Sequence, residues 1–298
     1  MFIRTAKTTA VLSALVLTLS ACGTDGDETE AAGEDQNTFT IGVANEHEAH
    51  RELQRIAEEE LGYEVELVNF TDYNQPNPAL SNGDLDANWF QHIAFLAEHN
   101  VASGDNLQPI GATETIPLTL YSDQYDDVEE FSSGDEVAIP NDPVNQGRAI
   151  NVLAAAGLVE LSDESAQPEP RHIDQEASTV TVNPVDAAQT VNALESLSGS
   201  VINNNFAQDA DLDPLNEGIF SDDPNDPSAV PYVNTFVTTE ENADNEALQE
   251  IAGLYHDDRV LEIMDERSNG TSVPAGDVST EDLNQALADY QEALEETD

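Results

Sequence analysis

The chain has 298 residues and a formal net charge of −53, from 8 Lys and Arg against 61 Asp and Glu. A surface this acidic repels phosphate groups, which argues against nucleic acids and anionic membranes as partners, while a hydrophobic content of 39% still allows one or two folded domains. Beyond residue 22 the cations are six Arg and no Lys, and we interpret this composition as adaptation to high salt, where charges are screened within roughly 3 Å at 1 M.

The N-terminus has the pattern of a secretory signal. Arg4 and Lys7 precede the apolar run "TAVLSALVLTLS", and "LSAC" then resembles a lipobox, in which the chain is cut before an acylated cysteine. We therefore expect a signal peptide at 1–21, lipidation of Cys22, and an acidic flexible tether at 22–37. The mature protein would be anchored by lipid outside the cytoplasmic membrane. Because Cys22 is the only cysteine, a disulfide framework and a thiolate metal cluster are both excluded.

Strands and helices alternate through the rest of the chain, which predicts an α/β fold with parallel strands between helices. The patterns in the first half predict strands at 38–44, 65–70 and 135–142, helices ending at Gly62 and near Gly83, helices at 93–100 and 145–157, and a long extended run at 108–122. In the second half they predict strands at 178–182, 199–205 and 230–239, a helix at 186–194, and one or two helices within 245–267.

The last 22 residues, 277–298, predict an additional amphipathic helix. Its apolar stripe consists of Leu283, Leu287, Tyr290 and Leu294. Ser279 or Thr280 would cap its start, followed by acids in the first turn.

The sequence gives little support to catalysis. It has no G-x-S-x-G elbow, no phosphate-binding glycine loop and no cysteine free for nucleophilic chemistry. With 61 acids, no carboxylate pair stands out as an acid/base couple. We therefore expect a protein that is not an enzyme.

One histidine pair raises the alternative of a metal site. His47 and His50 are spaced i, i+3 with Glu46 and Glu48 beside them, so on a helix both imidazoles share one face, which suits zinc when further ligands arrive. An exposed helix N-terminus explains the same pattern, and we favour that interpretation.

A binding cleft is the third option. Between residues 69 and 92 the chain gathers ring side chains that can grip an apolar or thioether group, together with amides that suit turns and hydrogen-bonded pockets. The rings are Tyr73, Trp89, Phe90 and His92, and the amides are Asn74, Gln75, Asn77 and Asn88. For Trp89 alone, an ordinary place in the core is an equal alternative.

A second polar cluster follows the strand at 135–142. Asn145 stands at the expected start of the next helix and Arg148 in its first turn, where N–H groups and a guanidinium fork suit a carboxylate. A surface salt bridge is the alternative for Arg148. The strand ends "VINNN" and "PYVN" are also rich in Asn, and ligands of parallel α/β sheets bind at the carboxyl ends of strands. Together these groups predict capture of a zwitterion without its chemical transformation.

Three motifs, "FTDYNQPNPALSNGDLDANWFQH", "VAIPNDPVNQGRA" and "VINNNFA", resemble those of the NlpA-type lipoproteins, the methionine-binding components of ABC importers. The resemblance covers residues 38–274, with the motifs in the family's order and spacing. It implies a two-lobe periplasmic-binding-protein-like fold of type II with the ligand cleft between lobes. Lobe 1 would comprise 38–122 plus 231–276, and lobe 2 would comprise 123–230. The helix at 277–298 has no counterpart in the family pattern.

The resemblance also implies a ligand site and partners. Tyr73, Phe90, His92 and Phe95 would line the pocket for the ligand's side chain, Arg148 with Asn145 would hold the α-carboxylate, and Asn203 and Asn234 would fix the head group. The ligand would be methionine or a closely related amino acid. It would pass to an ABC permease and its ATPase, with no cofactor.

Three residues depart from the family pattern. Ala94 replaces a proline, Phe95 lacks a tyrosine hydroxyl, and Phe206 stands where tyrosine is common. These changes bear on side-chain preference more than on head-group capture, since one lost hydrogen bond costs about 1 kcal/mol. Another apolar amino acid or a dipeptide is thus an open alternative. A zinc-binding lipoprotein using His47 and His50, and a surface lipoprotein whose acidic coat and added helix serve assembly, are the others.

Overall fold

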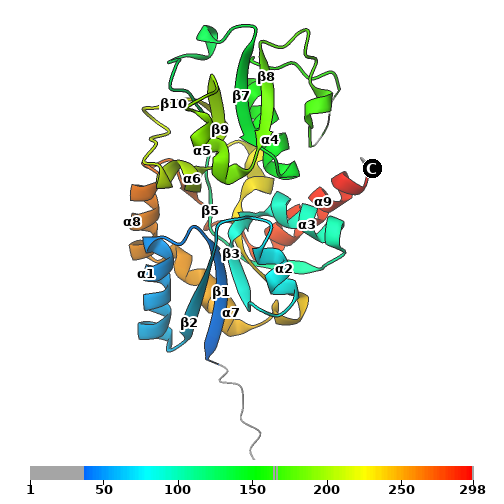
Figure 1. Cartoon of the computed structure of the whole chain (residues 1–298). Helices are drawn as coiled ribbons and strands as arrows, with labels where there is room; N and C mark the ends of the chain where they lie inside the picture. Colours follow the sequence, from blue (N-terminus) through cyan, green and yellow to red (C-terminus); the bar gives the residue numbers. More distant parts are fainter. Residues whose placement is uncertain (1–36, 164, 166, 297–298) are drawn as a thin grey trace, which may run out of the picture. The chain divides into compact units, whose positions relative to one another are not determined.

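The computed structural model describes residues 37–163, 165 and 167–296. The expected signal peptide, Cys22 and all of the expected tether except residue 37 lie outside the described residues. Within the described part, two five-stranded sheets form one above the other in Figure 1. None of the described helices is both long and apolar enough to cross a bilayer.

The first sheet has the strand order β2-β1-β3-β11-β4. Its strands β1 (Thr38–Ala44), β2 (Glu64–Phe70) and β3 (Ala87–His92) are parallel, as the sequence predicts. Strand β11 (Asn234–Thr239) runs antiparallel between β3 and β4 (Leu107–Ala112). Alternating apolar residues such as Ile41 and Val43 are fully buried, so the sheet forms the middle of a layered lobe.

Helices cover both faces of this sheet. One layer contains α1 (Glu48–Ile56), α7 (Glu246–Gly253) and α8 (Asp258–Arg267), and the other contains α2 (Pro76–Ser81), α3 (Ile93–Ser103) and α9 (Thr280–Glu295). Helix α1 continues as a π-helical turn, Ala57–Leu61, and ends at Gly62, whose φ of 76° lies in the left-handed region that favours glycine. The predicted helix end at Gly62 is therefore confirmed.

The second sheet has the order β10-β6-β9-β7-β8. Strands β7 (Asp135–Pro140), β8 (Val180–Val185) and β9 (Gly199–Ile202) are parallel, while β6 (Thr119–Tyr121) and β10 (Gly218–Ser221) complete it antiparallel. Helix α4 (Pro143–Ala155) packs on one face through Ile150 and Leu153, and α5 (Thr190–Ala193) and α6 (Asn204–Asp209) lie on the other. The result is a second α/β lobe with its own core.

Two segments cross between the sheets. The extended run predicted at 108–122 is divided into β4, a short β5 (Glu114–Thr115) that pairs with β12 (Val273–Pro274), and β6. The strand predicted at 230–239 is wrong in its first half, because Pro227–Tyr232 forms a 3-10 turn. Pro231 has no N–H for a sheet ladder, and β11 begins only at Asn234. The remaining 3-10 turns are Val128–Glu130, Pro170–His172, Ala187–Gln189, Glu240–Asn242 and Leu254–His256.

The C-terminal helix α9 docks on the first lobe. Leu283 and Leu287 are buried in the core formed with α2, α3 and β4, and Tyr290 and Leu294 pack against its rim. Ser279 caps the helix by accepting a hydrogen bond from the backbone N–H of Asp282. The helix predicted from the stripe is confirmed, and the apolar stripe is its contact with the fold.

Asn77 and Asn88, which the sequence suggested for a turn or pocket, belong to a buried network inside the first lobe. The side-chain amide of Asn88 donates to Asn77 Oδ1 at 2.9 Å, and Asn77 Nδ2 donates to Gln91 Oε1 at 2.8 Å. Gln91 Nε2 donates back to Asn77 Oδ1 and to Asn88 Oδ1. Because each of these side-chain amides is hydrogen-bonded to another, the network holds α2 against β3 without leaving a buried amide unpaired.

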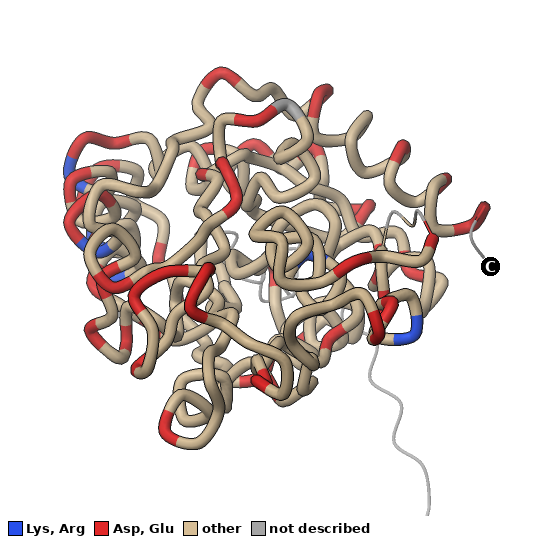
Figure 2. Tube along the Cα trace, turned by 90° about the horizontal axis from the view of Figure 1, so that it is seen from above, with Lys and Arg blue, Asp and Glu red and all other residues tan. Residues whose placement is uncertain are grey.

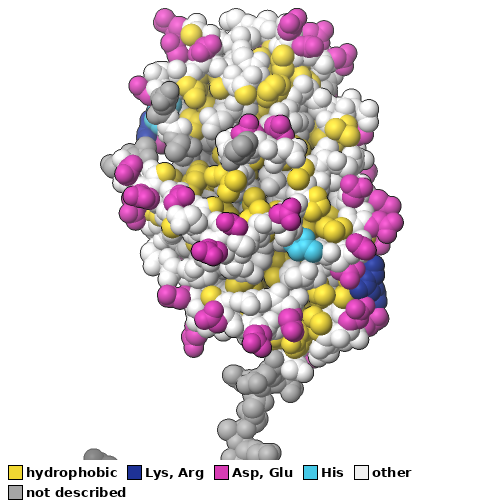
Figure 3. Space-filling model, turned by 180° about the vertical axis from the view of Figure 1, so that it is seen from behind, with side chains coloured by type: hydrophobic (Ala, Val, Ile, Leu, Met, Phe, Trp, Pro, Cys, Tyr) yellow, Lys and Arg dark blue, Asp and Glu magenta, His cyan; other side chains and the backbone are white. Residues whose placement is uncertain are grey.

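The acidic residues are spread over the described surface. Figure 2 shows Asp and Glu distributed along the chain on all sides, and the face in Figure 3 carries scattered acids with no single acidic patch. All six described Arg form ion pairs with acids. Most acids are therefore left without a cationic partner, which agrees with interpreting the charge as a property of the whole surface.

Candidate functional site

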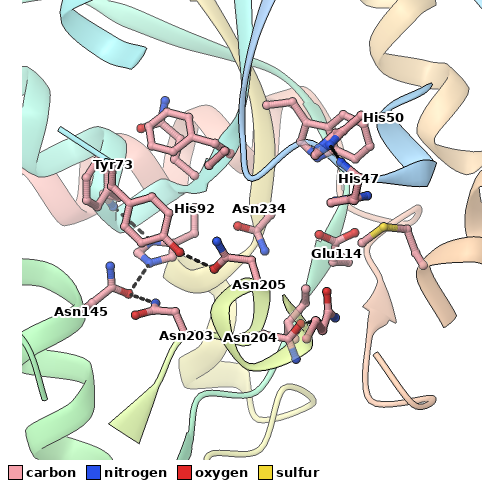
Figure 4. A pocket seen from close by; sticks show the side chains of 18 of the residues that line it. His47, His50, Tyr73, His92, Glu114, Asn145, Asn203, Asn204, Asn205 and Asn234 are labelled. Carbon is pink, nitrogen blue, oxygen red and sulfur yellow. Dashed lines mark hydrogen bonds between the residues drawn. The ribbon is translucent and has the colours of Figure 1, made fainter. Parts of the chain in front are cut away.

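A cavity of about 120 Å³ lies between the two lobes at the carboxyl ends of their parallel strands. Side chains from just beyond β1, β2, β7 and β9, and from the end of β3, reach into it, as Figure 4 shows for its labelled residues. Polar contacts also connect the lobes across it. The hydroxyl of Tyr73, from the first lobe, donates to Asn205 Oδ1 in the second. The structure therefore has the lobes closed on each other.

Aromatic rings form one wall of the cavity. Tyr73, Phe90 and Phe95 surround one another with ring centroids 5.7 to 6.2 Å apart, mostly edge to face. Phe206 adds a ring 5.4 Å from Tyr73 but lies outside the cavity lining. Burial raises the pKa of the Tyr73 phenol, so the ring stays neutral and its hydroxyl remains a donor. The wall suits an apolar or thioether group.

His92 connects this wall to the amides of the second lobe. It caps α3, with Nδ1 accepting a hydrogen bond from the backbone N–H of Phe95 at 3.2 Å. Nδ1 is therefore unprotonated, and the proton on Nε2 faces Asn145 Oδ1 at 3.4 Å. Burial, and then the charge of Arg148, lower the pKa of His92 to about 3. The imidazole is thus a neutral donor at ordinary pH.

A chain of amides lines the second lobe. Asn145, at the third position of α4, donates from Nδ2 to Asp142 Oδ1 and accepts at Oδ1 from Asn203 Nδ2, both at 3.0 Å. Asn203 stands directly before α6, without a hydrogen bond from its side chain to the start of the helix. Two buried atoms here, Asn203 Oδ1 and Asn205 Nδ2, have no hydrogen-bond partner among the described residues. Unsatisfied buried polar atoms are costly, so these two point to a polar ligand.

Arg148 lies in the second turn of α4, and not in the first as the sequence suggested, because the helix already begins at Pro143. Its Nε and Nη2 donate to the carboxylate of Asp222 at 2.7 and 3.2 Å, and Nη2 also donates to the Ile116 carbonyl. The guanidinium lies 4.3 Å from the ring centre of Tyr232. The arginine is 6% exposed and the Asp222 side chain is 28% exposed, so the salt bridge considered for Arg148 exists but is partly buried.

The other end of the cavity contains His47, His50 and Glu114. His47 stands directly before α1, and its backbone N–H donates to Nδ1 of the buried His50 at 3.0 Å. The two rings lie against each other with centroids 3.7 Å apart and planes tilted by 31°, and His50 packs edge-on against Trp89. Burial lowers the pKa of His47 to about 3 and that of His50 well below its usual range. The expectation that this histidine pair is an exposed helix start is wrong, since β1 directs it into the cavity.

A metal site has no support here. Among the described residues no group of three or more His, Cys, Asp or Glu side chains is placed to hold a metal ion.

The eight ligand-binding residues predicted from the sequence all line this one cavity: Tyr73, Phe90, His92, Phe95, Asn145, Arg148, Asn203 and Asn234. Sequence reasoning missed Glu114, Ile116, Asn204, Asn205, Gln208 and Met264, which line it as well. Asn204 and Asn205 stand inside the "VINNN" motif, so the signal was present for them. Trp89 serves in both ways considered: it lines the cavity and stacks on Phe236 in the core at 4.9 Å.

Two α/β lobes, two crossing segments and a polar and aromatic cavity between the lobes define a type II solute-binding fold. The model of the NlpA lipoprotein family matches residues 39–276, and the chain belongs to this family, as the resemblance of the three motifs indicated. The match ends shortly before α9.

Individual relatives agree with the family. The chain is 35% identical over 272 residues to the D-methionine-binding lipoprotein MetQ of Salmonella typhi, covering 90% of this chain and 97% of that protein. Protein PG110 from Staphylococcus aureus has a solved structure with a TM-score of 0.79 and 33% identity, covering 85% of this chain and 99% of that one. A nutrient-binding protein from Burkholderia cenocepacia, solved bound to methionine, has a TM-score of 0.73 and 27% identity, with coverages of 80% and 99%.

Proposed function

We propose that this chain is an extracytoplasmic solute-binding lipoprotein that captures methionine, or a closely related amino acid, for an ABC importer. The observation that carries the proposal is a cavity with an aromatic wall at one side and a buried arginine with amides at the other. This donor set fits an amino acid with an apolar side chain. The names of the relatives, which include methionine-binding lipoproteins, support the same ligand.

In this proposal the aromatic wall of Tyr73, Phe90 and Phe95 receives the thioether, whose sulfur makes favourable contacts with ring edges. Arg148 binds the α-carboxylate. Its described hydrogen bonds use Nε and Nη2, so Nη1 is the nitrogen left for the ligand. Asn203 offers its unpartnered Oδ1 to the head group, and Asn234 adds a second amide from the end of β11.

Capture proceeds by closure and needs no covalent chemistry. The hydrogen bonds from Tyr73 to Asn205 and from His92 to Asn145 join the lobes only when these are together, so they stabilise the closed state around a ligand. Lipid attachment at Cys22 would hold the protein beside its permease, which with its ATPase would complete the importer. Anchoring restricts the search for the permease to the membrane surface.

The first test is mass spectrometry of the small molecules released when the protein, purified in high salt without added ligand, is denatured. Stoichiometric methionine supports the proposal, and another amino acid keeps the class but changes the ligand. The same instrument checks for acyl chains on Cys22.

Titration of Arg148→Ala then tests the site itself. Loss of a buried charged partner costs about 2–5 kcal/mol, so methionine affinity should fall at least about 30-fold. Arg171→Ala is the matched control, since Arg171 is exposed, pairs with Glu169 and does not line the cavity. If Arg148 serves only its ion pair with Asp222, then Arg148→Ala and Asp222→Asn will lower stability together and leave the affinity of the folded protein unchanged.

A further inference from the structure

Glu114 is a carboxyl group that the proposed binding of an α-carboxylate does not use. It lies on β5, within the segment that crosses between the lobes, and it is only 4% exposed. Its Oε2 is buried and has no hydrogen-bond partner among the described residues. The side chain lines the cavity, and Figure 4 shows it on the same side as His47 and His50. A buried acid without a partner is costly unless something else enters the site to pair with it.

The surroundings of Glu114 define what that partner would be. A metal ion is unsuitable, because the described residues offer no second and third ligand beside it. An anion is unsuitable, because the Glu114 carboxyl group carries no positive charge in either protonation state and would repel an anion once ionised. The neighbouring lining residues His47, Asn234 and Met264 bring no positive charge of their own at neutral pH, since the pKa of His47 is lowered to about 3. A cationic donor from the ligand is what the site lacks.

The position of Glu114 relative to Arg148 fits a zwitterion. The Arg148 guanidinium donates to the carbonyl of Ile116, and Ile116 follows Glu114 by two residues, roughly 7 Å of extended chain. Both side chains line the same cavity. An acid and a guanidinium therefore line the same cavity from neighbouring parts of the crossing segment, so the two ends of one zwitterion can meet both.

We propose that Glu114 binds a primary ammonium group of the ligand and so selects for ligands that carry one. This inference rests on the proposed function, because it names a further contact of the same captured solute. The ammonium has two possible sources with the same chemistry: the α-ammonium of a free amino acid, or the N-terminal ammonium of a dipeptide that ends in methionine. Ammonium binding by a carboxylate is a charge-assisted hydrogen bond, which is among the strong ones.

Binding would then release a proton. Burial raises the pKa of Glu114 to about 8, so the empty site holds a neutral carboxylic acid at pH 6.5. When the ammonium arrives, the acid loses its proton to solvent and the ligand keeps its own protons. The titratable and charged side chains that line the cavity with Glu114 are His47, His50, Tyr73, His92 and Arg148, and the charge of Arg267 also lowers the pKa of His47 and His50. Arg267 already pairs with Asp209, and the pKa values of His47 and His50 keep both neutral at this pH.

Calorimetric titration at pH 6.5 tests this in two buffers of different ionisation enthalpy, which gives the number of protons released. The ligands are methionine, Gly-Met and 4-(methylthio)butanoate, which is methionine without its amino group. Wild type should release about one proton with the ammonium ligand that it binds. Glu114→Gln should release none and should bind that ligand at least about 10-fold more weakly. Its affinity for 4-(methylthio)butanoate should stay within about 3-fold of wild type.

The control is a second Glu→Gln substitution, away from the cavity. Glu66→Gln makes the same chemical change at an exposed position of β2 and should leave affinity and proton release as in wild type. If Glu114→Gln binds methionine or Gly-Met as wild type does, with the same proton release, the ammonium role is overturned and the proposed function stands. If wild type binds neither ligand, the proposed function fails and the role of Glu114 fails with it. Dependence on Glu114 for Gly-Met but not for methionine would assign the dipeptide as the source.

Discussion

The buried acid Glu114 should make the ligand-free protein less stable as the pH rises. Its pKa is about 8 in the folded chain, raised by burial from an ordinary 4.5. Between these values the unfolded chain has released the proton while the folded chain keeps it. The folded state thus binds more protons, and the free energy of unfolding falls as pH rises through this window. Below 4.5 the effect is absent, and above 8 it is complete.

The magnitude follows from the two pKa values. The gap from 4.5 to about 8, at about 1.36 kcal/mol per unit, sets a ceiling of about 5 kcal/mol. A cavity of about 120 Å³ has room for water, and hydration of the carboxylate lowers this value. Glu114→Gln keeps the shape and removes the charge. We therefore expect the variant to gain about 2–5 kcal/mol over wild type at pH 8.5 and almost nothing at pH 4.5.

Chemical denaturation of ligand-free wild type and Glu114→Gln, at steps from pH 4.5 to 8.5 in high salt, measures the difference directly. Glu66→Gln, exposed on β2, controls for the loss of one acid from a highly charged protein and should give a small difference at all pH values. The prediction is wrong if Glu114→Gln is no more stable than wild type, or if its gain in free energy of unfolding is the same at pH 5 and pH 8. Either result would mean that Glu114 ionises as freely in the folded chain as in the unfolded one.

Two further predictions concern the added helix and the acidic surface. Leu283→Ala should destabilise the protein by about 2–5 kcal/mol, since Leu283 lies on the buried face of α9 and is 1% exposed. Gln285→Ala, on the exposed face of the same helix, should change little. Equal losses of stability in denaturant unfolding would show that α9 is not docked through its apolar stripe. With 61 acids against 8 basic residues, the folded chain repels itself, and salt screens that repulsion. Raising NaCl from 0.1 to 2 M should therefore stabilise the fold by a few kcal/mol, which raises the thermal midpoint by about 5–10 °C. A midpoint that stays level or falls would contradict adaptation to high salt.

Local signals were enough to predict much of the fold. The strand at 38–44 follows from its alternation of apolar and polar residues, and it forms as expected. The helix end at Gly62 follows from a residue that tolerates positive φ, and it also forms as expected. Asn145 and Asn203 also come soon after strands, although β9 ends at Ile202, before the end of the strand predicted at 199–205. Each follows a strand that the sequence shows clearly, and parallel strands bring their carboxyl ends to one edge. A site made from strand ends can therefore be predicted before the structure is known.

Pairing between distant segments could not be predicted in this way. Arg148 is joined to Asp222, 74 residues away along the chain, and with 61 acids nothing in the sequence singles out that one. The contact of Tyr73 with Asn205 joins different lobes and exists only because the lobes meet. The strand predicted before Asn234 is wrong for a related reason: the chain forms a 3-10 turn between the lobes there, and no ladder continues through Pro231.

At Glu114 the rule that polar residues mark the solvent-exposed face of a strand fails, because this strand crosses between two lobes. In a strand with one face in solvent, alternate side chains point outward, and polar residues are expected to take those positions. Thr113, Glu114 and Thr115 are consecutive polar residues, and all three are at most 5% exposed. The segment passes between two lobes, so neither of its faces is in solvent. Polarity at such a place is therefore no sign of exposure, and a charged side chain there is explained by what enters the cavity.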